Sequence, residues 1–333
     1  MNIAVLGAGA WGTALAVQWA VHHQVVLWGR DAALIQDAQS RHENAHYLPG
    51  IALPDALKLT DSLDAAIQTA DVLILAVPTS ALRDTVIPLA QSNCPLIWVS
   101  KGFERDTRKL PHQIISEMLP QLTRTGVLSG PSFAQEVAQG HPTALALASS
   151  DIAFAHQMAA NLSSSRLRIY VNHDLIGVEI GGAVKNVMAI AAGICDGLKL
   201  GHNARAALVT RGLAEMTRLG IRLGGHTETF MGLSGLGDLI LTTTGDLSRN
   251  RQVGLRLSRG EHLDTILADL GHVAEGVTTT REVAKLAAEL NVDMPITRGI
   301  CGILFDGVPA AQAVEALLSR EIKTEFESTA TGC

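Results

Sequence analysis

The chain has little of what marks several protein classes. Its four cysteines, Cys94, Cys195, Cys301 and Cys333, are far apart in the sequence. This spacing excludes a CxxC zinc or redox pair and fits a reducing cytoplasm. Charged residues make up only 17%, and 26 basic against 32 acidic residues give a net charge of -6. Because no run of lysine or arginine occurs, nucleic acid is not an expected partner.

Long uncharged apolar runs are also lacking. We find no stretch with the roughly 20 uncharged apolar residues of a membrane helix, so we expect no membrane insertion. The segment from Ile3 to Ala20 is almost uncharged, but it lacks the basic start of a signal peptide. Hydrophobic residues still make up 47% of the 333 residues, which is enough for packed cores and favours two domains. We expect a cytoplasmic protein.

The first half of the chain alternates short apolar runs with segments of helix length. Such runs are typical of parallel strands buried on both faces. The predicted strands are 2–6, 24–28, 71–77, 95–99, 143–148 and 167–171. The predicted helices between them include 13–21, 62–69 and 107–118. Strand and helix in alternation predict a doubly wound sheet, which we assign to a domain of residues 1–172.

The pattern changes after about Asn172, where no further buried strand is predicted. The predicted helices there are 175–198, 204–219, 262–270, 279–290 and 310–318. We expect a second domain of residues 173–333 that is all-helical, with a frayed tail after about residue 326. The fold class is therefore α/β, with an N-terminal Rossmann-type doubly wound sheet followed by an all-helical C-terminal domain.

A glycine-rich turn, Gly7-Ala8-Gly9-Ala10-Trp11-Gly12, follows the first predicted strand and opens the first helix. In a dinucleotide-binding turn, Gly7 permits the tight bend, Gly9 lets the backbone approach the pyrophosphate, and Gly12 lets helix pack on strand. The N–H groups at the helix start would then face the diphosphate. The alternative is a plain structural turn, but the flanking strand and helix favour a cofactor site.

The end of the second predicted strand bears on the choice of cofactor. Arg30 follows Trp28-Gly29 at a place where an NAD-specific fold usually has an acid. A guanidinium suits the 2′-phosphate of NADPH, while Asp31 directly after it leaves NADH open. We therefore expect NADPH, NADH or both.

Two lysines are candidates for the reacting end of the crevice. Lys101 follows the strand 95–99, and ligands of open sheets bind beyond the carboxyl ends of strands. Lys185 lies in the apolar helical segment after the pair Gly181-Gly182, whose cost in a helix suggests close approach of another backbone or of the cofactor. Such a lysine either extends its ammonium group to water or performs chemistry. A desolvated lysine, with its pKa lowered further by a second cation, can donate a proton during carbonyl reduction.

Two polar motifs of the second half carry further candidates. Asp238, at the end of a glycine-dense turn, could orient a lysine or bond a substrate hydroxyl, and a helix N-cap is the alternative. Ser248-Arg249-Asn250-Arg251 precedes a helical segment and could form a phosphate site. A serine cap beside two solvated arginines is the alternative for this motif.

Taken together, these motifs resemble those of the bacterial NAD(P)-dependent glycerol-3-phosphate dehydrogenase family, from Met1 to about Ser319. Val184 stands where the family pattern leads us to expect leucine, a tolerable exchange. The matching segments are Gly7 to Ala14, Val99 to Gly102, Leu128 to Ala134, Gly182 to Asn186, Thr210 to Leu213, Gly232 to Leu241, Ser248 to Arg251 and Val273 to Gly276.

The resemblance implies reversible reduction of dihydroxyacetone phosphate to sn-glycerol 3-phosphate, the backbone of phospholipids. It implies Lys185 as general acid and base. The substrate-binding residues that it implies are Lys101, Gly130, Ser132, Lys185, Asp238, Ser248, Arg249 and Asn250. The cofactor-binding residues that the turn and the resemblance imply are Gly7, Gly9, Ala10, Trp11, Gly12, Arg30, Lys101, Ala134, Arg249 and Glu275.

Three other hypotheses stay open at this point. A dehydrogenase acting on a hydroxy acid or sugar acid would not depend on a substrate phosphate. A non-enzymatic NADPH sensor could use the same fold. His42 and His46 have a helical metal-ligand spacing, and His22-His23 are adjacent, but no acid or cysteine cluster supports them. We expect no metal, a small phosphorylated ketone or alcohol as the partner, and a homodimer as an open alternative.

Overall fold

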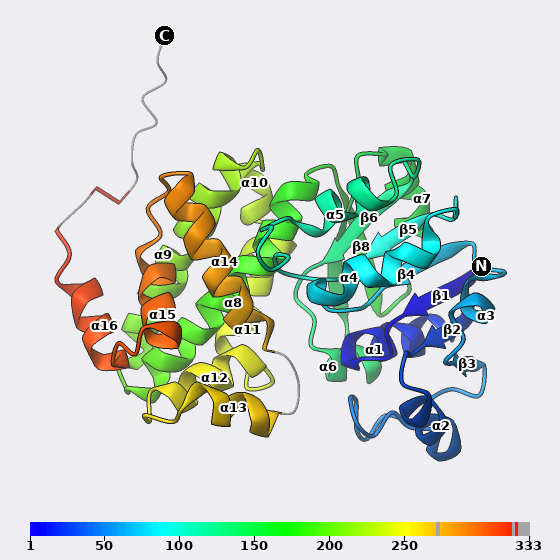
Figure 1. The fold of residues 1–333 in the computed structure, drawn as a ribbon, viewed down its shortest axis with the longest axis horizontal. Helices are drawn as coiled ribbons and strands as arrows, with labels where there is room; N and C mark the ends of the chain where they lie inside the picture. The colour runs from blue at the N-terminus through cyan, green and yellow to red at the C-terminus, as the bar shows by residue number, and fades with distance from the viewer. Residues whose placement is uncertain (271–273, 322–323, 326–333) are drawn as a thin grey trace, which may run out of the picture.

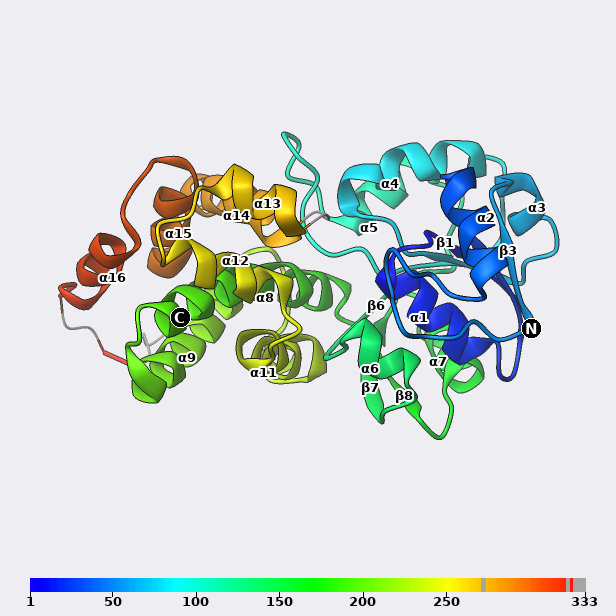
Figure 2. The same ribbon diagram turned by 90° about the horizontal axis from the view of Figure 1, so that it is seen from below.

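The structure is a computed structural model that describes residues 1–270, 274–321 and 324–325. Two bodies lie side by side, one built around a sheet and one built from helices (Figures 1 and 2). The chain passes from the first to the second between the last strand and the long helix at Leu175. The expected tail after about residue 326, with Cys333, lies outside the described residues.

The first body contains one eight-stranded sheet with the order β3-β2-β1-β4-β5-β6-β7-β8. Every neighbouring pair is parallel except β6 and β7. The chain leaves β1 toward one edge and returns to β4 on its other side, so a ligand crevice is expected between the carboxyl ends of these two strands. The strands are β1 Asn2–Leu6, β2 Gln24–Trp28, β3 Leu57–Thr60, β4 Val72–Leu75, β5 Leu96–Trp98, β6 Thr125–Ser129, β7 Thr143–Ala148 and β8 Leu167–Asn172.

Helices cover both faces of this sheet, as a doubly wound fold requires. Successive residues of β1 point to opposite faces: Ile3 and Val5 belong to one buried cluster, and Ala4 and Leu6 to another. All four residues of β4 are buried. The helices are α1 Ala10–Trp19, α2 Ala32–Arg41, α3 Leu63–Ile67, α4 Thr79–Val86, the 3-10 turn Ile87–Leu89, α5 Pro111–Met118, α6 Ala134–Ala138 and α7 Ile152–Leu162.

The second body is helical throughout its described residues and is organised around α8. This helix is long and apolar enough to cross a membrane by length and composition, but 89% of the apolar window is buried inside the protein, as in a core helix. Figure 1 shows α9, α11, α12 and α14 around it. The elements are α8 Leu175–Gly197, α9 Gly201–Arg222, α10 Thr227–Phe230, the π-helix Leu233–Gly237, α11 Asp238–Thr244, α12 Arg249–Leu257, α13 Leu263–Leu270, α14 Glu275–Glu289, α15 Pro295–Phe305 and α16 Ala310–Leu318.

Several predicted boundaries are corrected by the structure. The helix predicted over 107–118 begins only at Pro111, because Asp106 and Arg108 have φ values of 66° and 56° that no helix accommodates. Strand β3 escaped prediction because its LKLT sequence is half-exposed at the sheet edge. Helix α2 ends at Arg41, and His42 is left-handed, so His42 and His46 do not share a helical face.

Candidate functional site

The turn between β1 and α1 is built around three glycines, Gly7, Gly9 and Gly12. Gly7 has a φ of 127°, and a Cβ there would lie 2.5 Å from the carbonyl oxygen of Ala76. A Cβ on Gly12 would lie 2.0 Å from the Gly7 carbonyl oxygen, whereas a Cβ on Gly9 would meet nothing within 4 Å. Packing therefore requires glycine at positions 7 and 12. At position 9 the open space lies where a ligand would approach the backbone.

The amides at the start of α1 are left for such a ligand. The helix is N-capped by Gly9, no side chain bonds to its first amides, and its first turn holds no acid. A helix start with no side-chain cap and no acid in its first turn attracts an anion. Ala10 opens the helix, and Trp11 beside it is half-buried. The turn thus fits the pyrophosphate of a dinucleotide.

Asn44 supports the turn from the side and escaped the sequence analysis. Its Nδ2 donates to the carbonyl oxygen of Ala8 at 2.9 Å and to Thr13 Oγ1 at 2.8 Å. Asn44 is 6% exposed, so these bonds form in a dry environment. Its position in an irregular segment after α2 gave no pattern that could have signalled it.

Arg30 and Asp31 have different surroundings at the end of β2. The Asp31 carboxylate caps α2, accepting from the N–H groups of Ala33 at 2.9 Å and Leu34 at 3.2 Å. The Arg30 side chain is exposed. Asp31, the acid that could have bound the ribose of NADH, is therefore engaged in capping α2. The Arg30 guanidinium is accessible to a ligand.

The centre of the site is a buried carboxylate shared by two lysines. Lys101 Nζ donates to Asp238 Oδ2 at 2.8 Å, and Lys185 Nζ donates to Asp238 Oδ1 at 2.5 Å. The side chain of Asp238 is fully buried, and those of Lys101 and Lys185 are 14% and 9% exposed. Asp238 is the first residue of α11, after its N-cap Gly237, so the N-cap alternative is wrong.

Thr242 is a fourth member of this cluster. Lys185 Nζ donates to Thr242 Oγ1 at 2.9 Å, and Thr242 Oγ1 donates to the Asp238 carbonyl oxygen at 2.6 Å. Thr242 lies four residues after Asp238, which places both on one face of α11. Thr242 escaped prediction because the sequence gives no helical pattern over residues 238–244.

Burial changes the acidity of Lys185. Desolvation lowers its pKa to about 8, the nearby Lys101 charge acts in the same direction, and the Asp238 carboxylate opposes both. An ammonium with this pKa is protonated at neutral pH and gives up its proton easily.

The glycines of α8 let these groups come together. A Cβ on Gly181 would lie 2.3 Å from the Ser234 carbonyl oxygen, and one on Gly182 would lie 2.9 Å from Ser129 Oγ and 3.5 Å from the Lys101 side chain. Of the two predicted alternatives, close approach of another backbone is confirmed at Gly181, whereas Gly182 lies against side chains. These contacts bring the π-helix 233–237 and the end of β6 against α8.

The motif that begins α12 contacts the start of α14. Ser248 caps the helix, accepting from the Arg251 N–H at 3.3 Å, and Arg249 is exposed. Asn250 Oδ1 accepts from the Gly276 N–H at 3.1 Å, which leaves its amide NH2 to donate. Burial raises the pKa of Glu275, and the charges of Arg249, Lys101 and Lys185 act against that rise.

The segment after β6 lies at the junction of the two bodies. Gly130 has a φ of 142°, and Ser132 Oγ donates to its carbonyl oxygen at 3.0 Å. A Cβ on Gly237 would lie 3.6 Å from Pro131, so this segment faces the π-helix of the second body. Ala134 opens α6 and packs against the core of the first body.

A buried glutamate ties the sheet to α8. Glu179 Oε1 accepts from Trp98 Nε1 at 2.8 Å and from the His112 N–H at 2.9 Å, and its Oε2 lies 2.5 Å from His112 Nδ1. Trp98 ends β5, three residues before Lys101, and Glu179 is six residues before Lys185. This contact holds the strand and the helix that carry the two lysines together, and the sequence analysis assigned it no role.

Comparison with known proteins decides the family. Models of the NAD-dependent glycerol-3-phosphate dehydrogenase N-terminus and C-terminus match residues 2–155 and 174–315. A protein from Thiobacillus denitrificans named glycerol-3-phosphate dehydrogenase [NAD(P)+] is 64% identical over 328 residues, 98% of this chain and 100% of that protein.

The chain belongs to this family. A solved glycerol-3-phosphate dehydrogenase from Coxiella burnetii, 41% identical, superposes with a TM-score of 0.92 and covers 96% of this chain and 99% of its own. One from Saccharomyces cerevisiae is 28% identical, with a TM-score of 0.79 and coverage of 95% and 98%. Membership confirms the resemblance drawn from the motifs and makes the chain an oxidoreductase that uses NAD or NADP.

Proposed function

We propose that Lys185 is the general acid and base in the reversible reduction of dihydroxyacetone phosphate to sn-glycerol 3-phosphate by NAD(P)H. The observation that supports this most strongly is the buried triad in which Asp238 accepts from both Lys185 and Lys101. A desolvated ammonium with a pKa of about 8, held by a fixed carboxylate, suits a group that gives and takes a proton near neutral pH.

The cofactor is proposed to lie across the carboxyl ends of β1 and β4. Its pyrophosphate would bind Gly7, Gly9, Ala10, Trp11 and Gly12, and Arg30 would contact the adenosine end. Lys101, Ala134, Arg249 and Glu275 would lie along its nicotinamide half. When bound, the reduced nicotinamide supplies the hydride. Because Asp31 caps α2 while Arg30 is exposed, we propose a preference for NADPH.

The substrate is proposed to lie between Lys185 and the start of α12. Arg249 and Asn250 would bind the phosphate, and Ser248 would hold the turn that presents them. Lys101, Asp238, Gly130 and Ser132 would line the rest of the substrate at the junction. Fixing the phosphate would fix the distance from the ketone oxygen to Lys185 Nζ.

The proton balance follows from this arrangement. Hydride addition to the ketone carbon turns the carbonyl oxygen into an alkoxide. Lys185 hydrogen bonds to this oxygen, stabilises the growing negative charge and transfers one proton to it. The neutral amine left behind then takes a proton from solvent. In the reverse direction the same amine accepts the hydroxyl proton, while Asp238 and Thr242 hold it in place.

The remaining parts of the proposal concern the whole molecule. We assign residues 1–172 to the cofactor domain and residues 173–333 to the catalytic domain, with the boundary between β8 and α8. The proposed location is the cytoplasm, where the product would supply the phospholipid backbone, and the proposed assembly is a homodimer.

The experiment that tests the reaction follows the absorbance of reduced nicotinamide in the purified protein after addition of dihydroxyacetone phosphate. NADPH and NADH are run in parallel, and unphosphorylated dihydroxyacetone serves as the control substrate. Rapid oxidation with the phosphorylated ketone and slow oxidation with the control support the proposal. Equal rates with both ketones would contradict the phosphate site, and no oxidation with either cofactor would contradict the reaction.

A further inference from the structure

Asp196 and Lys185 lie on the same face of α8. They are 11 residues apart, close to three full turns, so their side chains leave the helix in nearly the same direction about 17 Å apart. Lys185 points to Asp238, whereas Asp196 points to a different helix, α12. One face of one helix thus bears both the proposed proton donor and a contact to the element that carries Arg249 and Asn250.

Helix α12 crosses α8 with almost no side chains between the two backbones. A Cβ on Gly193 would lie 2.0 Å from the Arg251 carbonyl oxygen, and one on Gly254 would lie 2.0 Å from the Ile190 carbonyl oxygen. Such a contact fixes how near the helices are. A directional contact between polar side chains adds to this packing and sets the position of the residues at the start of α12.

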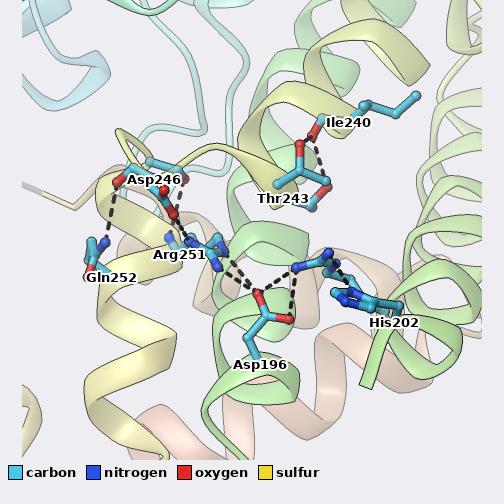
Figure 3. Close-up of polar contacts among 10 residues, drawn as sticks. Asp196, His202, Ile240, Thr243, Asp246, Arg251 and Gln252 are labelled. Carbon is cyan, nitrogen blue, oxygen red and sulfur yellow. Dashed lines mark hydrogen bonds and ion pairs between the residues drawn. The ribbon is translucent and has the colours of Figure 1, made fainter. Parts of the chain in front are cut away.

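Arg251 supplies that contact (Figure 3). Its Nε and Nη2 donate to Asp196 Oδ2 at 3.0 and 2.8 Å, and its Nη1 donates to Asp246 Oδ1 at 2.9 Å. Asp246 lies two residues before Ser248, and Arg251 directly follows Asn250. A single guanidinium therefore joins both ends of the segment 248–250 to α8.

Arg251 is engaged with carboxylates and is not placed to bind the substrate phosphate. Asp196 also accepts from Arg205 Nη1 at 3.1 and 3.2 Å, so two arginines face two aspartates. The Arg251 side chain is only 10% exposed and its donors point to carboxylates. Arg249, by contrast, is exposed and can present its charge to an anion.

We propose that Arg251, bonded to Asp196 and Asp246, is a positioning residue that holds the proposed phosphate-binding segment 248–250 at a fixed distance from Lys185. It touches neither substrate nor cofactor and acts through Arg249 and Asn250. The inference rests on the proposed function, because it takes the phosphate to bind at the start of α12.

The test compares catalytic efficiency for dihydroxyacetone phosphate with that for dihydroxyacetone, which has no phosphate to be positioned. Arg251→Met should lower kcat/KM at least about tenfold for the phosphorylated ketone, through kcat as well as KM, and leave kcat/KM for the unphosphorylated one nearly unchanged. Arg251→Lys, which keeps the charge but not the forked geometry, should recover only part of the loss.

Arg256→Met is the matched control. Arg256 is also on α12 and also bonds to two acids, Glu261 and Asp269, but it lies beyond the segment 248–250. In this variant the ratio of kcat/KM for dihydroxyacetone phosphate to kcat/KM for dihydroxyacetone should equal the wild-type ratio. If Arg251→Met is unfolded, Asp246→Ala replaces it, because the Asp246 side chain is 91% exposed and its removal takes away only one end of the link.

The outcomes are distinct. A selective loss with the phosphorylated ketone in Arg251→Met, or a smaller selective loss in Asp246→Ala, supports the positioning role. No loss with either ketone in the folded variant, or an equal loss of kcat/KM with both ketones, overturns the positioning role. Failure of the wild-type protein to turn over dihydroxyacetone phosphate would instead contradict the proposed function itself.

Discussion

Replacing Asp238 with asparagine should shift the pH dependence of the reaction in a predictable direction. The carboxylate opposes both the desolvation of Lys185 and the repulsion from Lys101, which together lower the lysine pKa to about 8. Asp238→Asn keeps the side-chain shape but removes the carboxylate that both ammonium groups contact. Lys185 is the more buried of the two, so we expect it to lose its proton more readily.

The size of the shift follows from the type of contact removed. An opposite charge in direct contact shifts a pKa by about one to three units. Since reduction needs protonated Lys185, wild-type reduction should decline as the pH rises through about 8. In the variant the decline should occur about one to three units lower. A shift of about two units would leave roughly one lysine in ten protonated at about pH 7.

The assay is kcat for reduction at saturating dihydroxyacetone phosphate and NADPH, measured from about pH 5.5 to about pH 10. Oxidation of sn-glycerol 3-phosphate needs the neutral amine, so its profile should rise through the same midpoint. Thr243→Val is the control, because Thr243 is buried on α11 but bonds only to the Leu239 and Ile240 carbonyl oxygens. An unchanged midpoint in Asp238→Asn would refute the assigned coupling between the carboxylate and Lys185.

The other predictions concern the cofactor site. Arg30→Ala should raise KM for NADPH about tenfold and KM for NADH less than about twofold, as measured by initial rates. Equal increases in both KM values would contradict the proposed contact between Arg30 and the 2′-phosphate. Gly9→Ala should fold with a nearly normal Tm yet bind NADPH more weakly, because the added methyl group enters space left for the ligand. Gly12→Ala should lose about 1–3 kcal/mol of stability, since its Cβ would lie 2.0 Å from the Gly7 carbonyl oxygen. Thermal unfolding and NADPH fluorescence titration separate these two effects, and a normal Tm for Gly12→Ala would contradict the packing argument.

The overall fold could be predicted because local patterns specify it. Continuous apolar runs such as Val72–Leu75 identify buried parallel strands, and long apolar helices after Asn172 identify the second body. The predictions failed where local patterns are weak. Strand β6 is not among the predicted strands, because its sequence contains Gly126, which breaks the apolar run. A Cβ at Gly126 would lie 2.8 Å from the Ala148 carbonyl oxygen, so this glycine is required by a tertiary contact.

The candidate site could be predicted only in part. Motifs identified Lys101, Lys185 and Asp238 individually, but their convergence on one carboxylate joins residues 53 and 137 positions apart. Periodicity carries no information on contacts at such separations. The supporting residues Asn44 and Glu179 have no motif at all, because their role depends on which backbone and side-chain donors the fold brings to them.

The central claim is that Lys185 provides the proton for carbonyl reduction, and turnover by Lys185→Met tests it most directly. The rate of NADPH oxidation with saturating dihydroxyacetone phosphate is measured beside Lys285→Met, which replaces a half-exposed lysine on α14. Circular dichroism and NADPH binding show that both variants are folded. We predict that kcat falls by about two orders of magnitude or more in Lys185→Met and stays at the wild-type value in Lys285→Met. Near-normal turnover by folded Lys185→Met would contradict the claim.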